Sequence, residues 1–269
     1  MTLELLVSCV SKDVHELVKT MNIESDAIIV NQKSDYSFEQ FDFGGNRITA
    51  LSMQEKGVGL SRTTALQRAT DDIVLFSDED IVYESGYSDM VMKAFEENPK
   101  TDIILFNVVV EEDRRTYWTD AVKSVHWWNC GRYPAYSIAV RTKRLHEVGL
   151  TYHLWFGGGA LYSCGEDSLF LNEALKLGLK IMAVPVTIGK EVTRTEGEAS
   201  TWFSGYNEKF FYDRGVLYHY LYGKLAPIMI FRFLRKNRAV MCKDISYAEA
   251  KKLMKRGAKE RTPWNGDKK

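Results

Sequence analysis

Acidic side chains follow a short apolar run in the first third of the chain. Residues 73–76 read Ile-Val-Leu-Phe, which is typical of a buried strand, and Asp78, Glu79 and Asp80 come where that strand must end. Asp78 and Asp80 lie on the same side of an extended segment, where neighbouring carboxylates repel. A hard divalent cation takes oxygen ligands of this kind. The stretch alone fits a metal site and a solvated acidic turn about equally well.

A second acidic pair begins a helix. Gly165, Glu166 and Asp167 precede a helix predicted over 168–177. The positive end of the helix dipole stabilises carboxylates at this position. An ordinary acidic helix cap is the alternative interpretation.

Two glycines precede another predicted helix. The segment 57–62 reads Gly-Val-Gly-Leu-Ser-Arg, a loop that enters a helix capped by Ser61. Backbone N–H groups at such a helix start form a plausible anion site. This helix leads directly into the 73–76 strand, so the loop and the acidic strand end are expected to lie close together.

Strands and helices are expected to alternate through the first 190 residues. The opening strand, helix and strand predict a mainly parallel sheet with a right-handed crossover. We expect strands at 3–10, 27–30, 47–52, 73–76, 102–110 and 180–184, the last stopped by Pro185, and helices after Ser11 and at 87–98, 141–148 and 168–177. Residues 31–46 are expected to form a loop.

Composition excludes several classes of protein. The 269 residues are 45% hydrophobic and 12% aromatic, which fits one large α/β domain with an appendage and excludes a disordered or fibrous protein. The four cysteines have no CxxC spacing, which argues against zinc and disulfides and predicts reduced thiols. The sequence has no basic leader and no long uncharged apolar span, so a cytoplasmic location is expected.

The C-terminal part is basic and aromatic. Residues 224–269 contain 14 Lys and Arg against 4 Asp and Glu, although the whole chain is neutral. Helices rich in aromatic rings and cations suit an anionic membrane surface, so peripheral binding at the cytoplasmic face is one expectation. A helical cap on the main domain, or a dimer surface, is the alternative. No motif for nucleic-acid binding accompanies the basic residues.

Taken together, the three motifs resemble those of the inverting family 2 glycosyltransferases with the GT-A fold. Gly59-Leu60-Ser61-Arg62, Asp78-Glu79-Asp80 and Gly165-Glu166-Asp167 occur in the family's order, within a match that covers 3–185. The resemblance implies a nucleotide-sugar-binding catalytic domain over 1–190 and a helical acceptor-side extension over 191–269. It also implies metal-dependent transfer of a sugar, with inversion, to a hydroxyl of a glycan or glycolipid.

The resemblance further implies roles for single residues. Asp80 is expected to bind the metal, Mn²⁺ or Mg²⁺, while Asp78 and Arg62 are expected to lie near the donor. Asp167 is expected to act as general base, and Glu166 to orient the acceptor.

Donor and acceptor contacts are less well defined. Ser8 and Asn31, at the ends of the first two strands, are expected to contact the donor, with a UDP-sugar preferred. Trp155, beside three glycines, is expected either to stack on an acceptor ring or to pack in the core. Residues 193–205 contain no histidine, which some relatives use as an additional metal ligand.

Two rival functions remain at this stage. A sugar-nucleotide nucleotidyltransferase shares acids at a strand end, but it is expected to have a long glycine-rich loop after the first strand, and residues 8–13 contain no glycine. The other rival is a non-catalytic carbohydrate-binding or membrane scaffold of the same fold.

Overall fold

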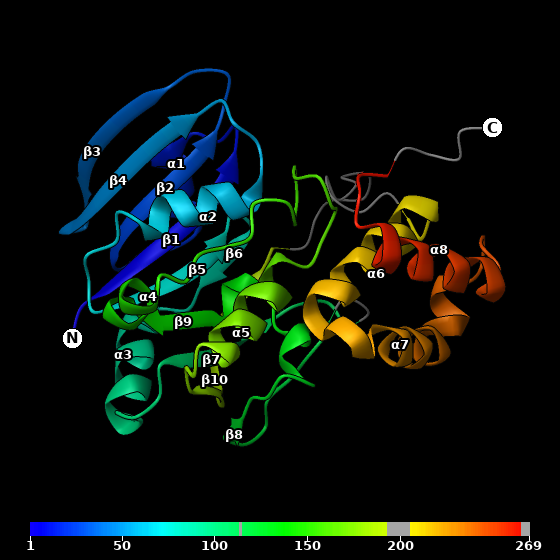
Figure 1. Cartoon of the computed structure of the whole chain (residues 1–269). Coiled ribbons are helices and arrows are strands. Elements are labelled where there is room, and N and C mark those ends of the chain that lie inside the picture. Colours follow the sequence, from blue (N-terminus) through cyan, green and yellow to red (C-terminus); the bar gives the residue numbers. More distant parts are fainter. Residues whose placement is uncertain (113–114, 193–204, 265–269) are drawn as a thin grey trace.

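One mixed sheet forms the centre of the main domain, and the C-terminal helices lie beside it (Figure 1). The computed structural model describes residues 1–112, 115–192 and 205–264. The strands are β1 (Leu3–Val10), β2 (Asp26–Gln32), β3 (Ser37–Phe43), β4 (Asn46–Met53), β5 (Ile73–Asp78), β6 (Ile81–Tyr83), β7 (Ile103–Val109), β8 (Lys123–Ser124), β9 (Ile138–Arg141) and β10 (Ile181–Glu191).

The strand order is β3-β4-β2-β1-β5-β9-β7-β10-β6, with β8 also paired to β10. Strands β4, β2, β1 and β5 are parallel to one another, as are β7 and β10. Strand β9 inserts antiparallel between β5 and β7, and β3 forms an antiparallel edge. The predicted α/β fold with a mainly parallel sheet of GT-A type is confirmed.

Helices cover both faces of the sheet because its central strands have apolar residues on both sides. In β1, Leu5 and Val7 face helices α1 (Val14–Thr20) and α3 (Tyr87–Glu97). Leu6 faces the opposite side, toward helices α2 (Val58–Leu66), α4 (Thr142–Val148) and α5 (Glu166–Lys176). Both faces are therefore buried, as expected for parallel strands.

Two predictions along the strands were wrong, and strand β9 was missed. Residues 31–46 are not a loop, because β3 pairs with β4 through a turn at Gly44 and Gly45, which both have positive φ. Strand β10 does not stop at Pro185, which lies at a register irregularity, but continues to Glu191. Strand β9 was not predicted, because it has only four residues and leads directly into α4.

The predicted helices exist, but three of them start elsewhere. Asp13, not Ser11, caps α1, where its Oδ1 accepts hydrogen bonds from two backbone N–H groups. Helix α2 begins at Val58, so Ser61 lies inside it rather than capping it. Helix α5 begins at Glu166, directly after Gly165.

The C-terminal region forms helices α6 (Glu208–Tyr222), α7 (Ala226–Met241) and α8 (Tyr247–Glu260). Two glycines let α6 and α8 approach closely: a Cβ at Gly215 or at Gly257 would lie 2.1 Å from a carbonyl oxygen of the facing helix. None of the described helices is both long and apolar enough to span a bilayer.

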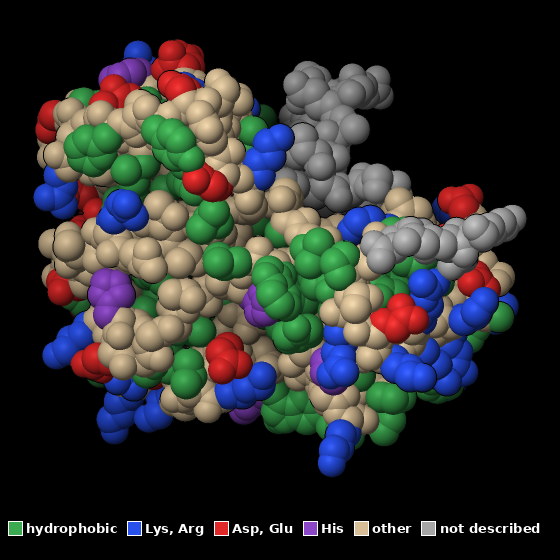
Figure 2. Space-filling view, turned by 45° about the horizontal axis from the view of Figure 1, so that its top comes forward, with side chains coloured by type: hydrophobic (Ala, Val, Ile, Leu, Met, Phe, Trp, Pro, Cys, Tyr) green, Lys and Arg blue, Asp and Glu red, His purple; other side chains and the backbone are tan. Residues whose placement is uncertain are grey.

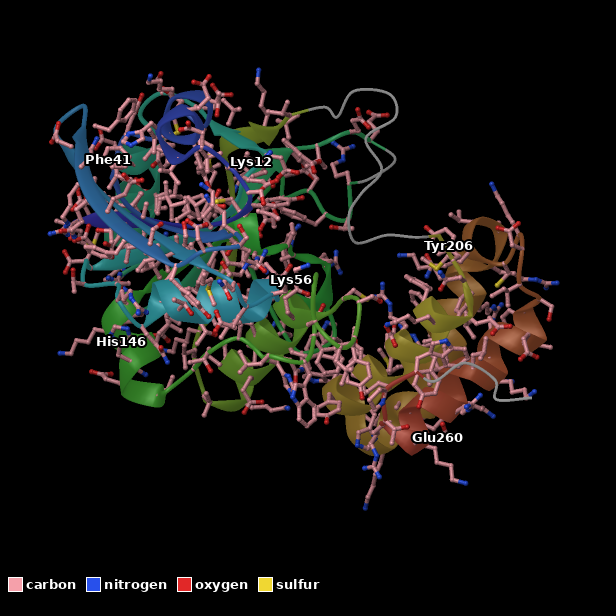
Figure 3. The ribbon with its side chains drawn as sticks, turned by 90° about the horizontal axis from the view of Figure 1, so that it is seen from above. Lys12, Phe41, Lys56, His146, Tyr206 and Glu260 are labelled. Carbon is pink, nitrogen blue, oxygen red and sulfur yellow. The ribbon has the colours of Figure 1, made fainter. Side chains whose placement is uncertain are left out.

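These helices also pack against the main domain. An apolar cluster joins α6 to the 156–162 loop and α5, through Phe156, Tyr162, Leu169, Tyr212, Val216 and Leu217. The tail therefore packs on the main domain, as in the alternative of a helical cap, and its binding to a membrane stays a prediction. From above, Phe41 on the sheet and Glu260 on α8 lie at opposite ends of the molecule (Figure 3).

Candidate active site

The ends of several strands meet at one cleft of about 550 Å³. Ser8 of β1, Asp78 of β5 and Glu191 of β10 line it, together with Asp80 and the start of α5. The carboxyl ends of parallel strands are where open α/β sheets bind ligands. The acidic strand end and the acidic helix start, 88 positions apart between Asp78 and Glu166 in the sequence, therefore belong to the same cavity.

Arg62 connects the two acidic motifs. Its Nη2 donates to Asp78 Oδ1 at 2.6 Å, and its Nη1 donates to Glu166 Oε1 at 3.1 Å and to Asp167 Oδ1 at 2.8 Å. The guanidinium lies 5.2 Å from the centre of the Tyr152 ring, and the side chain is only 3% exposed. Such a buried arginine fixes the relative positions of the three carboxylates.

Glycines make room for these contacts. Gly165 has φ +110°, and a Cβ there would lie 2.4 Å from the Leu217 side chain of α6. A Cβ at Gly157 would lie 2.7 Å from the Glu166 carboxyl carbon. The start of α5 thus approaches both the 156–162 loop and α6 more closely than any other residue type would permit.

Burial and charge together perturb the acids. Burial raises the pKa of Asp167, and the neighbouring Glu166 carboxylate raises it further, while Arg62 opposes both effects. The same three carboxylates raise the pKa of Arg62 despite its burial, so it stays charged. A carboxylate with a raised pKa and 21% exposure can accept a proton from a ligand in the cleft.

The donor set of the cleft fits a divalent cation. Its described lining contains six acidic side chains but three arginines: Asp78, Glu79, Asp80, Glu166, Asp167, Glu191, and Arg62, Arg132, Arg214. This excess of negative charge would repel a diphosphate unless a cation accompanied it. No three metal-ligating side chains converge among the described residues, so a bound ion would take further oxygens from substrate and water, as Mg²⁺ commonly does.

The three acids at the end of β5 differ in their contacts. Glu79 is turned toward the end of β1, where its carboxylate accepts from the Val10 N–H at 2.7 Å and pairs with Lys12 at 3.3 Å. Asp78 contacts Arg62, and Asp80 lines the cleft next to β10. Asp80 is thus the acid of this motif best placed for a metal; its predicted role stays a prediction.

The two predicted donor contacts at the first strands are placed differently. Ser8 lines the cleft and accepts a hydrogen bond from Ser61 at 3.0 Å. Asn31 is fully buried, and its amide bonds to both backbone groups of Lys12, which fixes the turn after β1. Its neighbour Gln32 lines the cleft instead, so the structure gives Asn31 a positioning role rather than open access to a ligand.

Trp155 is not a core residue. Its side chain is 54% exposed and packs edge-on to His153, outside the lining of the cleft. The alternative of core packing is therefore wrong, and stacking on an acceptor stays a prediction. Residues 193–204, which include most of the segment without histidine, lie outside the described part of the chain.

Three cleft residues were missed from sequence. Glu191 reaches the cleft because β10 passes Pro185, and the β-branched residues Val186, Thr187 and Ile188 were a signal for that continuation. Arg132 comes from an irregular loop, and Arg214 comes from α6. No local pattern could reveal these two, because their positions depend on how the loop and the tail fold against the sheet.

The comparison with known families decides the assignment. The sequence profile described as glycosyl transferase family 2 matches residues 14–162, which is more than half of the chain. The chain belongs to glycosyl transferase family 2. No curated protein matches the sequence of this glycosyltransferase.

Solved structures agree on the fold of the glycosyltransferase. S. aureus TarS 1-349 in complex with UDP-GlcNAc is similar with a TM-score of 0.62 at 15% identity, over 91% of this chain and 74% of that chain. The mannosyltransferase PcManGT from Pyrobaculum calidifontis, in complex with GDP-Man and Mn²⁺, is similar with a TM-score of 0.50 at 12% identity, over 96% and 69%. The likeness extends over the helical tail as well as the sheet.

Proposed function

We propose that the protein is a metal-dependent inverting glycosyltransferase that moves a sugar from a nucleotide-sugar to a hydroxyl of a glycan or lipid-linked glycan. The observation that carries this proposal is the single buried guanidinium of Arg62, which holds Asp78 and Asp167 in one cleft. Asp78 marks the donor side of the cleft, next to Asp80. Asp167 marks the acceptor side, at the start of α5.

Asp167 is the general base in this proposal. Its carboxylate takes the proton of the acceptor hydroxyl, whose oxygen bonds to the anomeric carbon while the bond from that carbon to the nucleoside diphosphate oxygen breaks. The diphosphate departs from the face opposite the attack, so one displacement inverts the anomeric configuration. Arg62 and Gly165 keep the Asp167 carboxylate oriented, and Glu166 lies beside it to position the acceptor.

Asp80, with Asp78 beside it, would hold Mn²⁺ or Mg²⁺ at the donor end of the cleft. A divalent ion there supplies Lewis-acid stabilisation of the charge that develops on the diphosphate. The Mn²⁺ in the complex of PcManGT supports the choice of metal. The acidic lining of this cleft supports it independently.

The preferred donor is a UDP-sugar. The complex of TarS contains UDP-GlcNAc, and TarS has the higher TM-score of the two relatives. Ser8 and Gln32 lie where a ribose or base would meet the ends of β1 and β2.

We further propose a cytoplasmic enzyme that is peripheral at the membrane. The exposed Leu225 and Ile228 lie at the start of α7, close in the chain to the exposed Lys224, a combination that suits anionic lipid headgroups. Lys and Arg side chains gather over the C-terminal helices (Figure 2). A lipid-linked acceptor would be reached from such a position.

Thermal unfolding tests the donor and the metal together. UDP-sugars with Mn²⁺ are expected to raise the apparent Tm of the wild type, because a ligand that binds only the folded state stabilises it. Asp80→Ala should abolish the part of this shift that depends on Mn²⁺. Glu79→Ala is the matched control, since Glu79 pairs with Lys12 and should leave most of the shift intact.

The rate of sugar transfer tests Asp167 as general base and distinguishes the glycosyltransferase from the two rival functions, a scaffold and a nucleotidyltransferase. Asp167→Asn should keep donor binding while sugar transfer falls by about 10²-fold to 10⁴-fold. A scaffold would keep its biological role in this variant. A nucleotidyltransferase would release pyrophosphate from a nucleoside triphosphate, and either result would contradict the proposal.

A further inference from the structure

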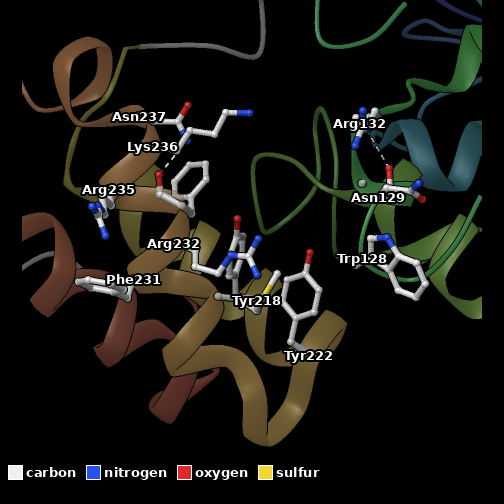
Figure 4. Close-up of a pocket in the computed structure, with 13 residues that line it drawn as sticks. Trp128, Asn129, Arg132, Tyr218, Tyr222, Phe231, Arg232, Arg235, Lys236 and Asn237 are labelled. Atoms are coloured by element: carbon white, nitrogen blue, oxygen red, sulfur yellow. Dashed lines mark hydrogen bonds between the residues drawn. The ribbon is translucent and has the colours of Figure 1, made fainter. Parts of the chain in front are cut away.

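A second cavity lies between residues 128–132 and the C-terminal helices. This groove, of about 630 Å³, has Trp128 and Arg132 on one wall and Tyr218 of α6 with Arg232, Arg235 and Lys236 of α7 on the other. Figure 4 shows the two walls facing each other, with Arg232 projecting beside Tyr222 into the space between them. We call it the α7 groove.

The α7 groove is basic, in contrast to the acidic catalytic cleft. No acidic side chain is among its described lining residues. Arg232, Arg235 and Lys236 are exposed, and none of them forms an ion pair within the described part of the chain. The Arg132 guanidinium donates to a backbone carbonyl, that of Asn129 at 3.2 Å. Four cations thus line one cavity, and none of them forms an ion pair with a carboxylate among the residues that the structure describes.

Aromatic side chains accompany these cations. Trp128 is 58% exposed and stacks on His126 at 4.5 Å between ring centres, which holds the indole in place. Tyr218 lies on the opposite wall and is mostly buried. A flat ring at the edge of a polar groove suits the face of a sugar.

The groove is continuous with the catalytic cleft. Gly131 and Arg132 line both cavities, so a chain lying in the groove can extend past Arg132 toward Asp167. Gly131 also lies next to Ser168 of α5, whose hydroxyl donates to the Gly131 carbonyl at 3.4 Å. The groove therefore opens on the acceptor side of the cleft.

We propose that the α7 groove binds the acceptor through anionic groups, either phosphate or carboxylate, that lie a few units away from the hydroxyl being glycosylated. This proposal rests on the proposed function and specifies its substrate class: an anionic glycan rather than a neutral one. The concave shape and the aromatic walls favour a glycan chain over a flat lipid surface. The exposed Leu225 and Ile228, which suit lipid, are not part of the groove lining.

Equilibrium binding to the full-length protein tests this proposal. The probes are hexagalacturonate, tripolyphosphate, neutral maltohexaose, and phosphatidylcholine vesicles with and without phosphatidylglycerol, titrated by calorimetry and tryptophan fluorescence. The groove variant combines Arg232→Gln, Arg235→Gln and Lys236→Gln. The control removes the same charge from exposed positions of α8, as Lys252→Gln, Lys255→Gln and Lys259→Gln.

Both anionic soluble probes are expected to bind the wild type more tightly than maltohexaose. The groove variant should lose at least about tenfold in affinity for them, since it removes three charge-assisted contacts, whereas the control should change about twofold or less. Trp128→Ala should weaken hexagalacturonate but not tripolyphosphate, because only the former has a ring to stack.

Three results would overturn the proposal: equal weakening by the α8 control, no binding of either anionic probe, or binding only to anionic vesicles, which would assign the cations to a membrane surface. Metal-dependent stabilisation by nucleotide-sugars is measured in the same variants and should be unchanged. If the wild type lacks that stabilisation, the proposed function fails, while the titration still decides whether the groove binds anions.

Discussion

Arg62 shares its charge among three carboxylates, which leaves an excess of negative charge in a poorly hydrated position. This arrangement fixes the carboxylate of Asp167, the proposed base, but the pKa of Asp167 is also raised through burial and through Glu166. An unfolded aspartate titrates near pH 3.9, so the folded chain binds more protons than the unfolded chain between about pH 3.9 and the raised pKa. In this window, stability from Asp167 is therefore lost as pH rises.

At the residue scale we predict that Asp167→Asn stabilises the metal-free protein at pH 8, because it removes a carboxylate whose charged form is disfavoured by burial in the folded state. The advantage over the wild type should shrink as pH falls and should be smallest below about 3.9, where Asp167 becomes protonated in the unfolded state as well. Urea unfolding across this pH range, with a chelator present, measures the difference. An advantage that is independent of pH would show that Asp167 does not titrate above its usual range.

At the scale of elements, the start of α5 depends on its neighbours more than on its own sequence. Gly165 has no side chain to cap the helix, and its φ of +110° brings it against Leu217 of α6. The Ser163 N–H donates to Asp213 of α6 at 3.0 Å, one turn before Leu217. The helix that carries the proposed base is thus held by a helix of the tail.

Alanine substitutions at the two ends of α5 test this dependence. Gly165→Ala should lower stability and reduce kcat by more than tenfold, because it combines backbone strain of about 1–3 kcal/mol with a clash against Leu217. Gly178→Ala, just after α5, has a positive φ but nothing within 4 Å, so it adds only strain. Equal kcat values in the two variants, measured by sugar transfer, would mean that the Leu217 contact does not position Asp167.

The acidic motifs could be predicted from the sequence, but the hydrogen bonds that join them could not. Asp78 and Asp167 were found because each follows a local pattern, a strand end or a helix start. Arg62 was expected near the donor, but its bonds to Glu166 and Asp167 span more than 100 residues and depend on the order of strands. The edge strand β3 and the continuation of β10 were missed because glycine and proline usually mark turns and the ends of strands. The basic and aromatic tail that forms one wall of the α7 groove was recognised, but the groove itself is defined by tertiary packing.

At the scale of the whole molecule, the helical tail is a small unit with its own apolar core. Phe211, Leu234, Leu253 and Met254 belong to this core. Its tightest contact is the crossing of α6 and α8 at Gly215 and Gly257.

Gly257→Ala tests this crossing, because helix propensity and close packing predict opposite changes in the free energy of unfolding. Helix propensity alone would make the change stabilising by up to about 1 kcal/mol. Because a Cβ would lie 2.1 Å from the Tyr212 carbonyl oxygen, we expect a loss of about 1–3 kcal/mol instead. Hydrogen exchange should speed up in α8 while β1 and β5 stay protected. A stabilised variant would contradict the close packing.

The contact between Gly165 and Leu217 also bears on how such an enzyme can diversify. If the tail selects the acceptor as we propose, recombination changes acceptor preference by replacing one tail with another beside an unaltered sheet. Here a tail from another enzyme would have to place a side chain shaped like Leu217 against Gly165. It would also have to place a carboxylate within hydrogen-bond distance of the Ser163 N–H. Chimeras joined after β10 should therefore fold poorly unless the 156–165 loop is exchanged along with the tail, and lineages of this fold should inherit these two segments together.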